Sequence, residues 1–279
     1  MKKIAFCFLV TDGVQVPEIW KSWFSGYESY FSIYAHFKIT DEKNLAAGDQ
    51  KWLWSKKIPS IRTEWGTISL VKAEMLLYRA ALQDLSNEVM VLLSGSDVPL
   101  FAFDKTYNWL MEPHPETKRV MSWIRFFEPE DHVVPLLPKH KFWHASQWKS
   151  VNRYIAFLLS KMPEEYLQEW DKLFPLKERK EADFLAPDEI VPFHYLVSVL
   201  GTPDSKTFQQ DIENRAVTYV DFPKMNALHP IVWKDLSASL IKDLCRWKIP
   251  FLRKVESNFK ATLPIVCPKY ATMRTKINK

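Results

Sequence analysis

The chain has 279 residues, of which 47% are hydrophobic and 14% aromatic, so it is long enough to bury a substantial core. Its 38 Lys and Arg residues against 33 Asp and Glu give a net charge of +5, without the basic stripe that is typical of nucleic-acid-binding proteins. Cys7, Cys245 and Cys267 follow no metal-ligand spacing, and we expect reduced, buried thiols in a protein that is not secreted.

The first hundred residues predict alternating strands and helices. Ile4–Val10 is an apolar run typical of a buried strand, and Pro17–Phe24 predicts an amphipathic helix with proline in its first turn. Tyr30–His36 predicts a second strand, Leu70–Leu82 has apolar residues at helical spacing, and Val89–Leu93 predicts a third strand. This order implies an α/β fold with a mostly parallel central sheet flanked by helices.

The later part of the chain is less regular. We expect strands at Met121–Phe127 and Ala216–Asp221, and helices at Val151–Leu159, Pro163–Phe174, Pro187–Leu200 and Leu236–Cys245. No linker separates independent domains, so we expect one domain over residues 1–279. It would comprise a nucleotide-binding half of about 1–106, an acceptor and catalytic half of about 107–255, and a tail of 256–279.

The N-terminus resembles the start of a signal peptide, because Met1-Lys2-Lys3 precedes an apolar run. That run is too short to span a membrane, and no small-residue cleavage site follows it. No later segment reaches transmembrane length, so we expect a soluble, cytoplasmic protein.

Several common site signatures are absent. The sequence has no Gly-x-Gly, which argues against a dinucleotide fingerprint or a P-loop. It has no Asp-x-Asp, the carboxylate pair with which many nucleotide-sugar enzymes hold a divalent cation. His140 and His144 stand four residues apart without a third ligand, and we interpret them as surface or loop histidines. We therefore predict no metal site.

Four polar or aromatic clusters carry the remaining signal. They are Trp65-Gly66-Thr67 with a helix containing Ala73-Glu74, Ser94-Gly95-Ser96-Asp97-Val98-Pro99-Leu100, Trp143-His144-Ala145-Ser146-Gln147-Trp148, and Ala186-Pro187-Asp188-Glu189. The second cluster ends a buried strand, which is where an open α/β sheet places a ligand. Each cluster alone is weak, but their combination and order are specific.

In that combination the chain resembles the core-2/I-branching family of glycosyltransferases, which includes β-1,6-N-acetylglucosaminyltransferases and peptide xylosyltransferases. The family's final Phe-x-Arg-Lys-like segment is similar to Phe251-Leu252-Arg253-Lys254-Val255, so the resemblance runs from about Ile4 to Val255. Animal members carry a membrane anchor, a stem and several disulfides. Since none of these features is recognised here, we expect a catalytic domain of bacterial or viral type.

The resemblance implies a glycosyltransferase-A-like fold and a metal-independent, inverting transfer from a UDP-sugar to a glycan hydroxyl, with no cofactor. N-acetylglucosamine is the first expectation for the sugar and xylose the second. Glu189 matches the family's catalytic base, and Arg215 and Lys254 match its diphosphate-binding cations. Trp65 falls near the expected uracil, and His36 falls where the family often has an acidic residue near the nucleoside, which leaves its role open. An inverting transfer does need one carboxylate to accept the acceptor proton, and fixed cations can stabilise the leaving diphosphate.

Structural alternatives remain open for most of these residues. Glu189 could cap a helix while Asp188 acts as the base, and Arg253 could replace Lys254 at the diphosphate. Arg215 could be a solvated charge at a strand end. The expected donor-pocket residues Ser96 and Asp97, with Ser94, could instead only close their turn.

The acceptor side has its own candidates. We assign Trp143, Gln147, Trp148, Asp188 and Glu128 to acceptor binding, although both tryptophans could belong to the core. The rival function is a catalytically inactive carbohydrate-binding protein with the same fold.

Overall fold

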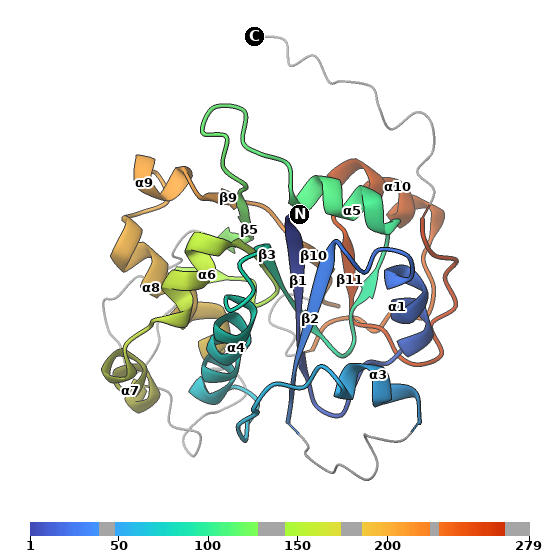
Figure 1. Ribbon diagram of the computed structural model, residues 1–279, viewed down its shortest axis with the longest axis horizontal. Coiled ribbons are helices and arrows are strands. Elements are labelled where there is room, and N and C mark those ends of the chain that lie inside the picture. Colours follow the sequence, from blue (N-terminus) through green and yellow to red (C-terminus); the bar gives the residue numbers. More distant parts are fainter. Residues whose placement is uncertain (39–47, 128–142, 174–185, 224–228, 266–279) are drawn as a thin grey trace.

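The computed structural model describes residues 1–38, 48–127, 143–173, 186–223 and 229–265. Its central sheet has six strands in the order β2-β1-β3-β8-β5-β9 (Figure 1). These are β1 (Lys3–Val10), β2 (Phe31–Phe37), β3 (Asn87–Ser94), β5 (Ser122–Ile124), β8 (Ser150–Asn152) and β9 (Ile212–Asn214). β1 pairs in parallel with β2 and β3, and β5 pairs in parallel with β9, whereas β8 runs antiparallel to both neighbours. The predicted α/β class is confirmed, with a mixed, largely parallel sheet.

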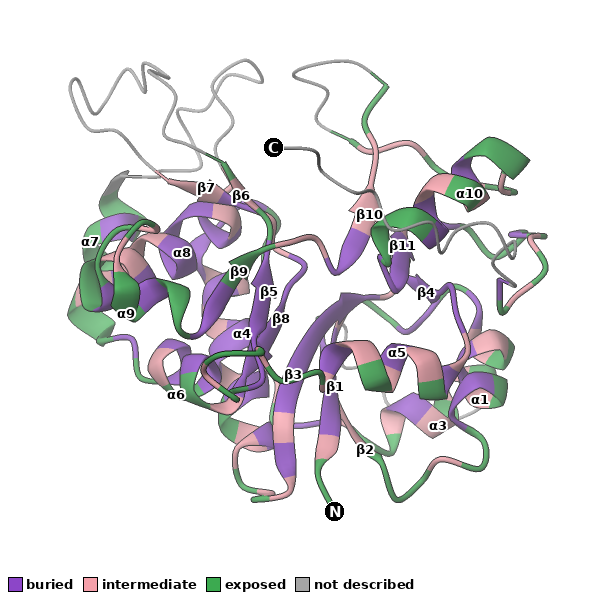
Figure 2. Cartoon of the chain, turned by 90° about the horizontal axis from the view of Figure 1, so that it is seen from above, coloured by how far each residue is buried: buried purple, intermediate pink, exposed green. Residues whose placement is uncertain are grey.

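Helices lie on both faces of this sheet (Figure 1). One face carries α4 (Ile68–Ala81), α6 (Arg153–Ser160), α7 (Glu164–Leu173), α8 (Pro187–Leu200) and α9 (Lys206–Gln209), and the other carries α1 (Pro17–Phe24), η1 (Gly48–Gln50), α3 (Lys51–Trp54) and α5 (Phe103–Leu110). Successive residues of β1 alternate between the two cores: Ala5 and Cys7 pack towards α4, and Phe6 and Phe8 pack towards α1. Because both faces are covered, the central strands are buried along almost their whole length (Figure 2).

Two small sheets complete the fold. β10 (Thr218–Val220), β11 (Phe251–Arg253) and β4 (Val98–Pro99) form a three-stranded sheet beside α10 (Ala238–Trp247), whereas β6 (Phe126–Phe127) pairs with β7 (His144–Ala145). Among the described residues, no helix is both long and apolar enough to cross a membrane.

The boundaries of two predicted elements are wrong. Met121–Phe127 is not one strand, because Arg125 separates β5 from β6 and its carbonyl accepts the Ser146 N–H at 2.7 Å. The predicted helix at Val151–Leu159 begins only at Arg153, since Val151 pairs with β3 and the Asn152 side chain caps the helix by accepting the Ile155 N–H.

The cysteine prediction is wrong at one position. Cys7 is a free, buried thiol, and burial raises its pKa. Cys245, however, is disulfide-bonded.

The loops that follow β1 and β3 meet at the carboxyl edge of the sheet. A Cβ atom on Gly95 would lie 2.3 Å from the Gly13 carbonyl oxygen, so only glycine allows this approach. The Gln15 N–H donates to the Gly95 carbonyl at 2.7 Å, and the Gln50 side chain bonds both backbone polar groups of Val14. These contacts fix the edge on which the candidate site is built.

Candidate active site

The turn that follows β3 forms one wall of the site, and hydrogen bonds to a buried carboxylate stabilise this turn. Asp97 Oδ2 accepts the Ser94 backbone N–H at 2.6 Å, and the Ser96 N–H donates to Ser94 Oγ at 3.1 Å. Asp97 is fully buried, and this burial raises its pKa to about 6 although the nearby Arg253 charge opposes the rise. Asp97 therefore holds the turn from inside, whereas Ser96 is half-buried and reaches the surface.

Arg253 lies against this turn. β11 runs antiparallel to β4, which follows the turn, and the Arg253 guanidinium donates to Ser94 Oγ. The same guanidinium lies 4.5 Å from the centre of the Trp148 ring. Burial lowers the Arg253 pKa, and the charges of Asp97, Glu189 and Asp188 oppose that shift. Arg253 is thus a partly desolvated cation among three carboxyl groups.

Lys254 is the neighbouring cation. Its backbone carbonyl accepts the Trp233 N–H at 2.8 Å, which fixes the chain at this point. Its side chain is half-buried, and within the described part of the chain its ammonium group has no ion-pair partner. The two residues that the sequence left as alternatives therefore differ: Arg253 is bound to the turn, and Lys254 is available to a ligand.

Two adjacent carboxyl groups begin α8, but only one reaches solvent. Asp188 is buried, and burial together with the Glu189 charge raises its pKa to about 7. The Glu189 side chain is 34% exposed. A general base must reach the proton that it removes, and of these two carboxyl groups Glu189 meets that condition.

His144 contacts the accessible carboxylate. Its Nε2 lies 3.0 Å from Glu189 Oε2, and its side chain, carried by β7, is 43% exposed. The exposed fraction agrees with the predicted surface histidine, but the contact with Glu189 is one that the sequence did not indicate. His140 lies outside the described residues. The two partners are 45 positions apart, and no local spacing in the sequence connects them.

A fully buried ion pair lies near the two carboxyl groups of α8. Lys149 Nζ donates to both carboxylate oxygens of Glu74, at 2.9 and 3.0 Å, and each side chain is 2% exposed. Both charges act on Asp188, with Lys149 lowering its pKa and Glu74 raising it. The pair joins α4 to the segment that enters β8. Sequence analysis missed it because the residues are 75 positions apart.

Comparison with known proteins agrees with this arrangement. The sequence profile of the core-2/I-branching enzymes matches residues 4–245. The chain belongs to the core-2/I-branching enzyme family. Its resemblance to that family is thereby confirmed.

One curated relative is glycosyltransferase BC10 of rice, Oryza sativa subsp. japonica, which is 24% identical over 268 residues. The match covers 87% of this chain but only 65% of the rice protein, so the chain spans less than two thirds of that relative's length. Core-2/I-branching enzymes are glycosyltransferases with a GT-A fold and a metal-independent mechanism, and the α/β architecture observed here is consistent with that fold.

Arg215, the other predicted diphosphate cation, makes its described side-chain contacts with residues outside the Glu189 site. Its guanidinium stacks on Trp123, 3.6 Å from the ring centre, and lies 3.9 Å from the Glu213 carboxylate. Burial lowers the Arg215 pKa, and the acidic groups that oppose the shift are Glu213 and Glu112. None of these groups belongs to the Glu189 site, so this geometry gives no support to Arg215 as a diphosphate ligand.

Two residues expected near the nucleoside differ in exposure. His36 is fully buried, its Nε2 accepts the Ile61 N–H at 3.0 Å, and burial lowers its pKa to about 4. A neutral, buried imidazole offers no surface to a nucleotide. Trp65 is 53% exposed just before α4, with its ring centre 5.9 Å from that of His229, so it remains accessible for stacking on a base.

The residues assigned to the acceptor are only partly at the surface. Trp148 is buried under Arg253, and Trp143 packs with Phe126 and Phe193 in the core around α8. Gln147, between the two tryptophans, is half-buried, and Glu128 lies outside the described residues. Within the described ranges, no group of three or more His, Cys, Asp or Glu side chains is arranged to hold a metal ion.

Proposed function

We propose that this protein transfers a sugar from a UDP-sugar to a glycan hydroxyl, with inversion at the transferred carbon and without a metal ion. N-acetylglucosamine is the first candidate for the sugar, and xylose is the second. The observation that carries the proposal is the combination of the accessible Glu189 carboxylate with the Arg253 cation at the carboxyl edge of the sheet. Base and cation are the two groups that a metal-independent inverting transfer requires.

In this proposal Glu189 accepts the proton of the acceptor hydroxyl as the acceptor oxygen attacks the anomeric carbon. A new carbon–oxygen bond forms on one side of the sugar while the bond to the UDP oxygen breaks on the other side, and UDP leaves with its electron pair. The hydrogen bond between His144 and Oε2 of Glu189 fixes the carboxylate, which leaves Oε1 for the acceptor.

The cations stabilise the negative charge that develops on the leaving diphosphate. Arg253 is positioned by Ser94 and Trp148, while Lys254 contributes an ammonium group with no ion-pair partner in the described chain. Such preorganised charges are strongest where water is partly excluded. Trp65 provides a surface for the uracil ring.

Turnover tests the proposal directly. We expect UDP-N-acetylglucosamine or UDP-xylose to raise the melting temperature, because a ligand that binds only the folded state stabilises it. With the stabilising donor and an oligosaccharide acceptor, transfer should persist in excess EDTA, as measured by release of UDP and mass of the product. An absolute requirement for manganese or magnesium contradicts the metal-independent mechanism. Donor binding with neither transfer nor hydrolysis favours the inactive carbohydrate-binding alternative.

The cation assignment predicts a graded loss of UDP affinity. Lys254→Met removes one charge from the diphosphate and should raise the Kd for UDP about 10- to 100-fold, since a hydrogen bond to a charged group contributes about 1.5–3 kcal/mol. Arg253→Lys keeps a charge but loses the planar contact with Trp148 and should weaken binding less. Isothermal titration with UDP measures both.

Arg215→Met is the matched control, because the Arg215 guanidinium, like that of Arg253, lies over a tryptophan ring, in this case Trp123. We expect an unchanged Kd for UDP in this variant. If Arg215→Met weakens UDP binding as much as Lys254→Met does, the diphosphate lies elsewhere and the assignment to Arg253 and Lys254 fails.

A further inference from the structure

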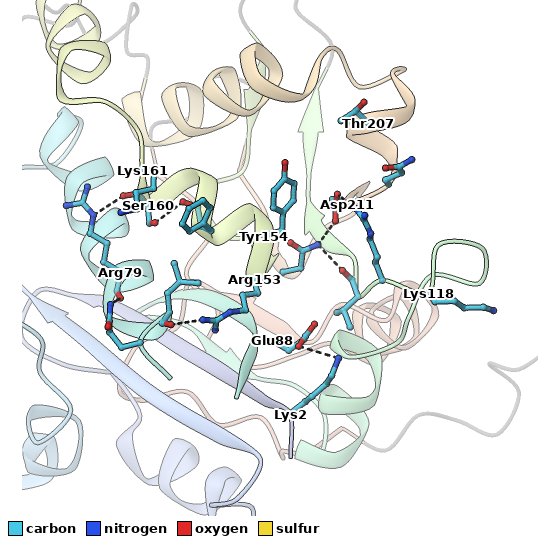
Figure 3. A pocket seen from close by; sticks show the side chains of 17 residues that line it. Lys2, Arg79, Glu88, Lys118, Arg153, Tyr154, Ser160, Lys161, Thr207 and Asp211 are labelled. Carbon is cyan, nitrogen blue, oxygen red and sulfur yellow. Dashed lines mark hydrogen bonds and ion pairs between the residues drawn. The ribbon is translucent and has the colours of Figure 1, made fainter. Parts of the chain in front are cut away.

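A large groove lies at the opposite edge of the central sheet from the candidate active site. It has a volume of about 1210 Å³, and its lining includes Lys2 and Glu88 at the amino ends of β1 and β3, together with the outer face of α6 (Figure 3). The candidate active site lies at the carboxyl end of β3, and an eight-residue strand separates the two edges by roughly 20–25 Å. A ligand in this groove therefore does not occupy the donor site.

The groove concentrates positive charge. Six basic residues line it, with two acidic ones: Lys2, Arg79, Lys118, Arg119, Arg153 and Lys161, against Glu88 and Asp211. Each acidic residue is already paired, Glu88 with Lys2 at 3.3 Å and Asp211 with Arg119 at 2.9 Å. The remaining four cations have no ion-pair partner in the described chain. Six basic and two acidic residues give the lining of the groove a net charge of +4.

The unpaired cations are held in place by uncharged groups. Arg153 donates to the carbonyls of Leu82, Asp84 and Asn87, and Arg79 donates through Nε to the Ser160 carbonyl at 2.8 Å. Carbonyl contacts fix these guanidinium groups without neutralising them. Figure 3 shows Arg79 and Lys161 at one end of the groove and Lys118 at the other. The charge is therefore distributed along the groove.

Two exposed aromatic rings lie between the charges. Tyr154 and Phe157 are 47% and 50% exposed and stand three residues apart on α6, so they share one face of the helix. The opposite face, with Ile155 and Leu159, is buried in the core. Lys161 Nζ lies 6.0 Å from the centre of the Phe157 ring. Aromatic faces bind the apolar faces of sugar rings, and Lys and Arg bind carboxylate, sulfate or phosphate groups.

We propose that this groove is a binding site for an acidic oligosaccharide, which stacks sugar rings on Tyr154 and Phe157 and places its anionic groups on Arg79, Lys118 and Lys161. The choice of a glycan as occupant rests on the proposed glycosyltransferase function. In this proposal the enzyme binds an acidic glycan at a site remote from the active site in which the sugar is transferred.

The test measures binding of hexagalacturonate, an acidic hexasaccharide, by isothermal titration, with neutral maltohexaose as the matched control. We expect hexagalacturonate to bind and maltohexaose not to bind. Affinity should fall about tenfold or more between 50 and 500 mM salt, because added salt screens exposed charges. Lys161→Glu and Phe157→Ala should each weaken binding at least fivefold, whereas Lys242→Glu, an exposed lysine on α10, should not.

Binding by the Glu189→Gln variant separates this proposal from the catalytic one. Unchanged affinity in a variant that has lost transfer supports an independent site, and binding without any transferase activity in the native protein leaves the groove valid while the proposed function fails. The groove assignment is overturned if hexagalacturonate does not bind, if Lys161→Glu and Phe157→Ala bind as well as the native protein, or if hexathymidylate binds more tightly than hexagalacturonate.

Discussion

Replacing Glu189 by Gln is expected to reduce sugar transfer by about 10²–10⁴-fold, because the amide keeps the shape of the side chain but cannot accept a proton. The amide can still bond to His144, so the local geometry should survive. UDP affinity should hardly change, since Glu189 faces the acceptor in our proposal. The measurement is the transfer rate at saturating donor, together with a UDP titration of the same preparation.

Asp188→Asn is the matched control for this loss. Burial raises the pKa of Asp188 to about 7, so near neutral pH much of this carboxyl group is already protonated in the folded protein. Asparagine resembles that neutral form, and we expect a smaller loss of transfer than in Glu189→Gln. If Asp188→Asn is folded and loses more activity than Glu189→Gln, the base has been assigned to the wrong carboxyl group.

Replacing Lys149 by Met should destabilise the protein by about 3–5 kcal/mol, because it leaves the Glu74 carboxylate buried without its counter-charge. Both side chains are 2% exposed, so water cannot replace the lost contacts at 2.9 and 3.0 Å. Urea unfolding at neutral pH measures the change in the free energy of unfolding. A loss below about 1 kcal/mol would show that the site tolerates the unpaired carboxylate.

Two further variants separate the contribution of the buried charges to stability from the contribution of side-chain packing. The double variant Glu74→Leu with Lys149→Met removes both charges and should recover much of the lost stability, as apolar replacements of buried ion pairs often do. The exposed pair Lys72–Glu164, with a contact of 2.5 Å and side chains 35% and 54% exposed, is the control. Lys72→Met should cost less than about 1 kcal/mol, because solvent already screens this pair.

The elements that could be predicted from the sequence are those with a periodic pattern of apolar residues. The strand at Val89–Leu93 and the helix that precedes it were predicted from runs of apolar residues, and the structure places them at β3 and α4. The two- and three-residue strands β4, β7, β8 and β11 were not predicted as strands. Segments this short have no periodicity of their own, because they become strands only when a distant partner supplies the hydrogen bonds.

The candidate site divides in the same way. The family motifs pointed to Glu189 and Lys254 as candidates, but they did not reveal that His144 contacts Glu189 or that Glu74 pairs with Lys149. They also assigned Arg215 to the diphosphate, a role that its contacts with Trp123 and Glu213 do not test. A motif gives the residue type and its order in the chain, but contacts across 45 or 75 positions depend on how strands are paired.

The sequence by itself determined the α/β class and the family, because apolar periodicity and local motifs are properties of neighbouring residues. Only the tertiary structure decided which charged side chains are buried, paired or exposed. Asp188 and Glu189 are adjacent in the chain, yet one is buried with a pKa of about 7 and the other is 34% exposed. Their environments differ because solvent exposure and counter-charges come from elements that are distant in sequence, and those elements meet only in the folded protein.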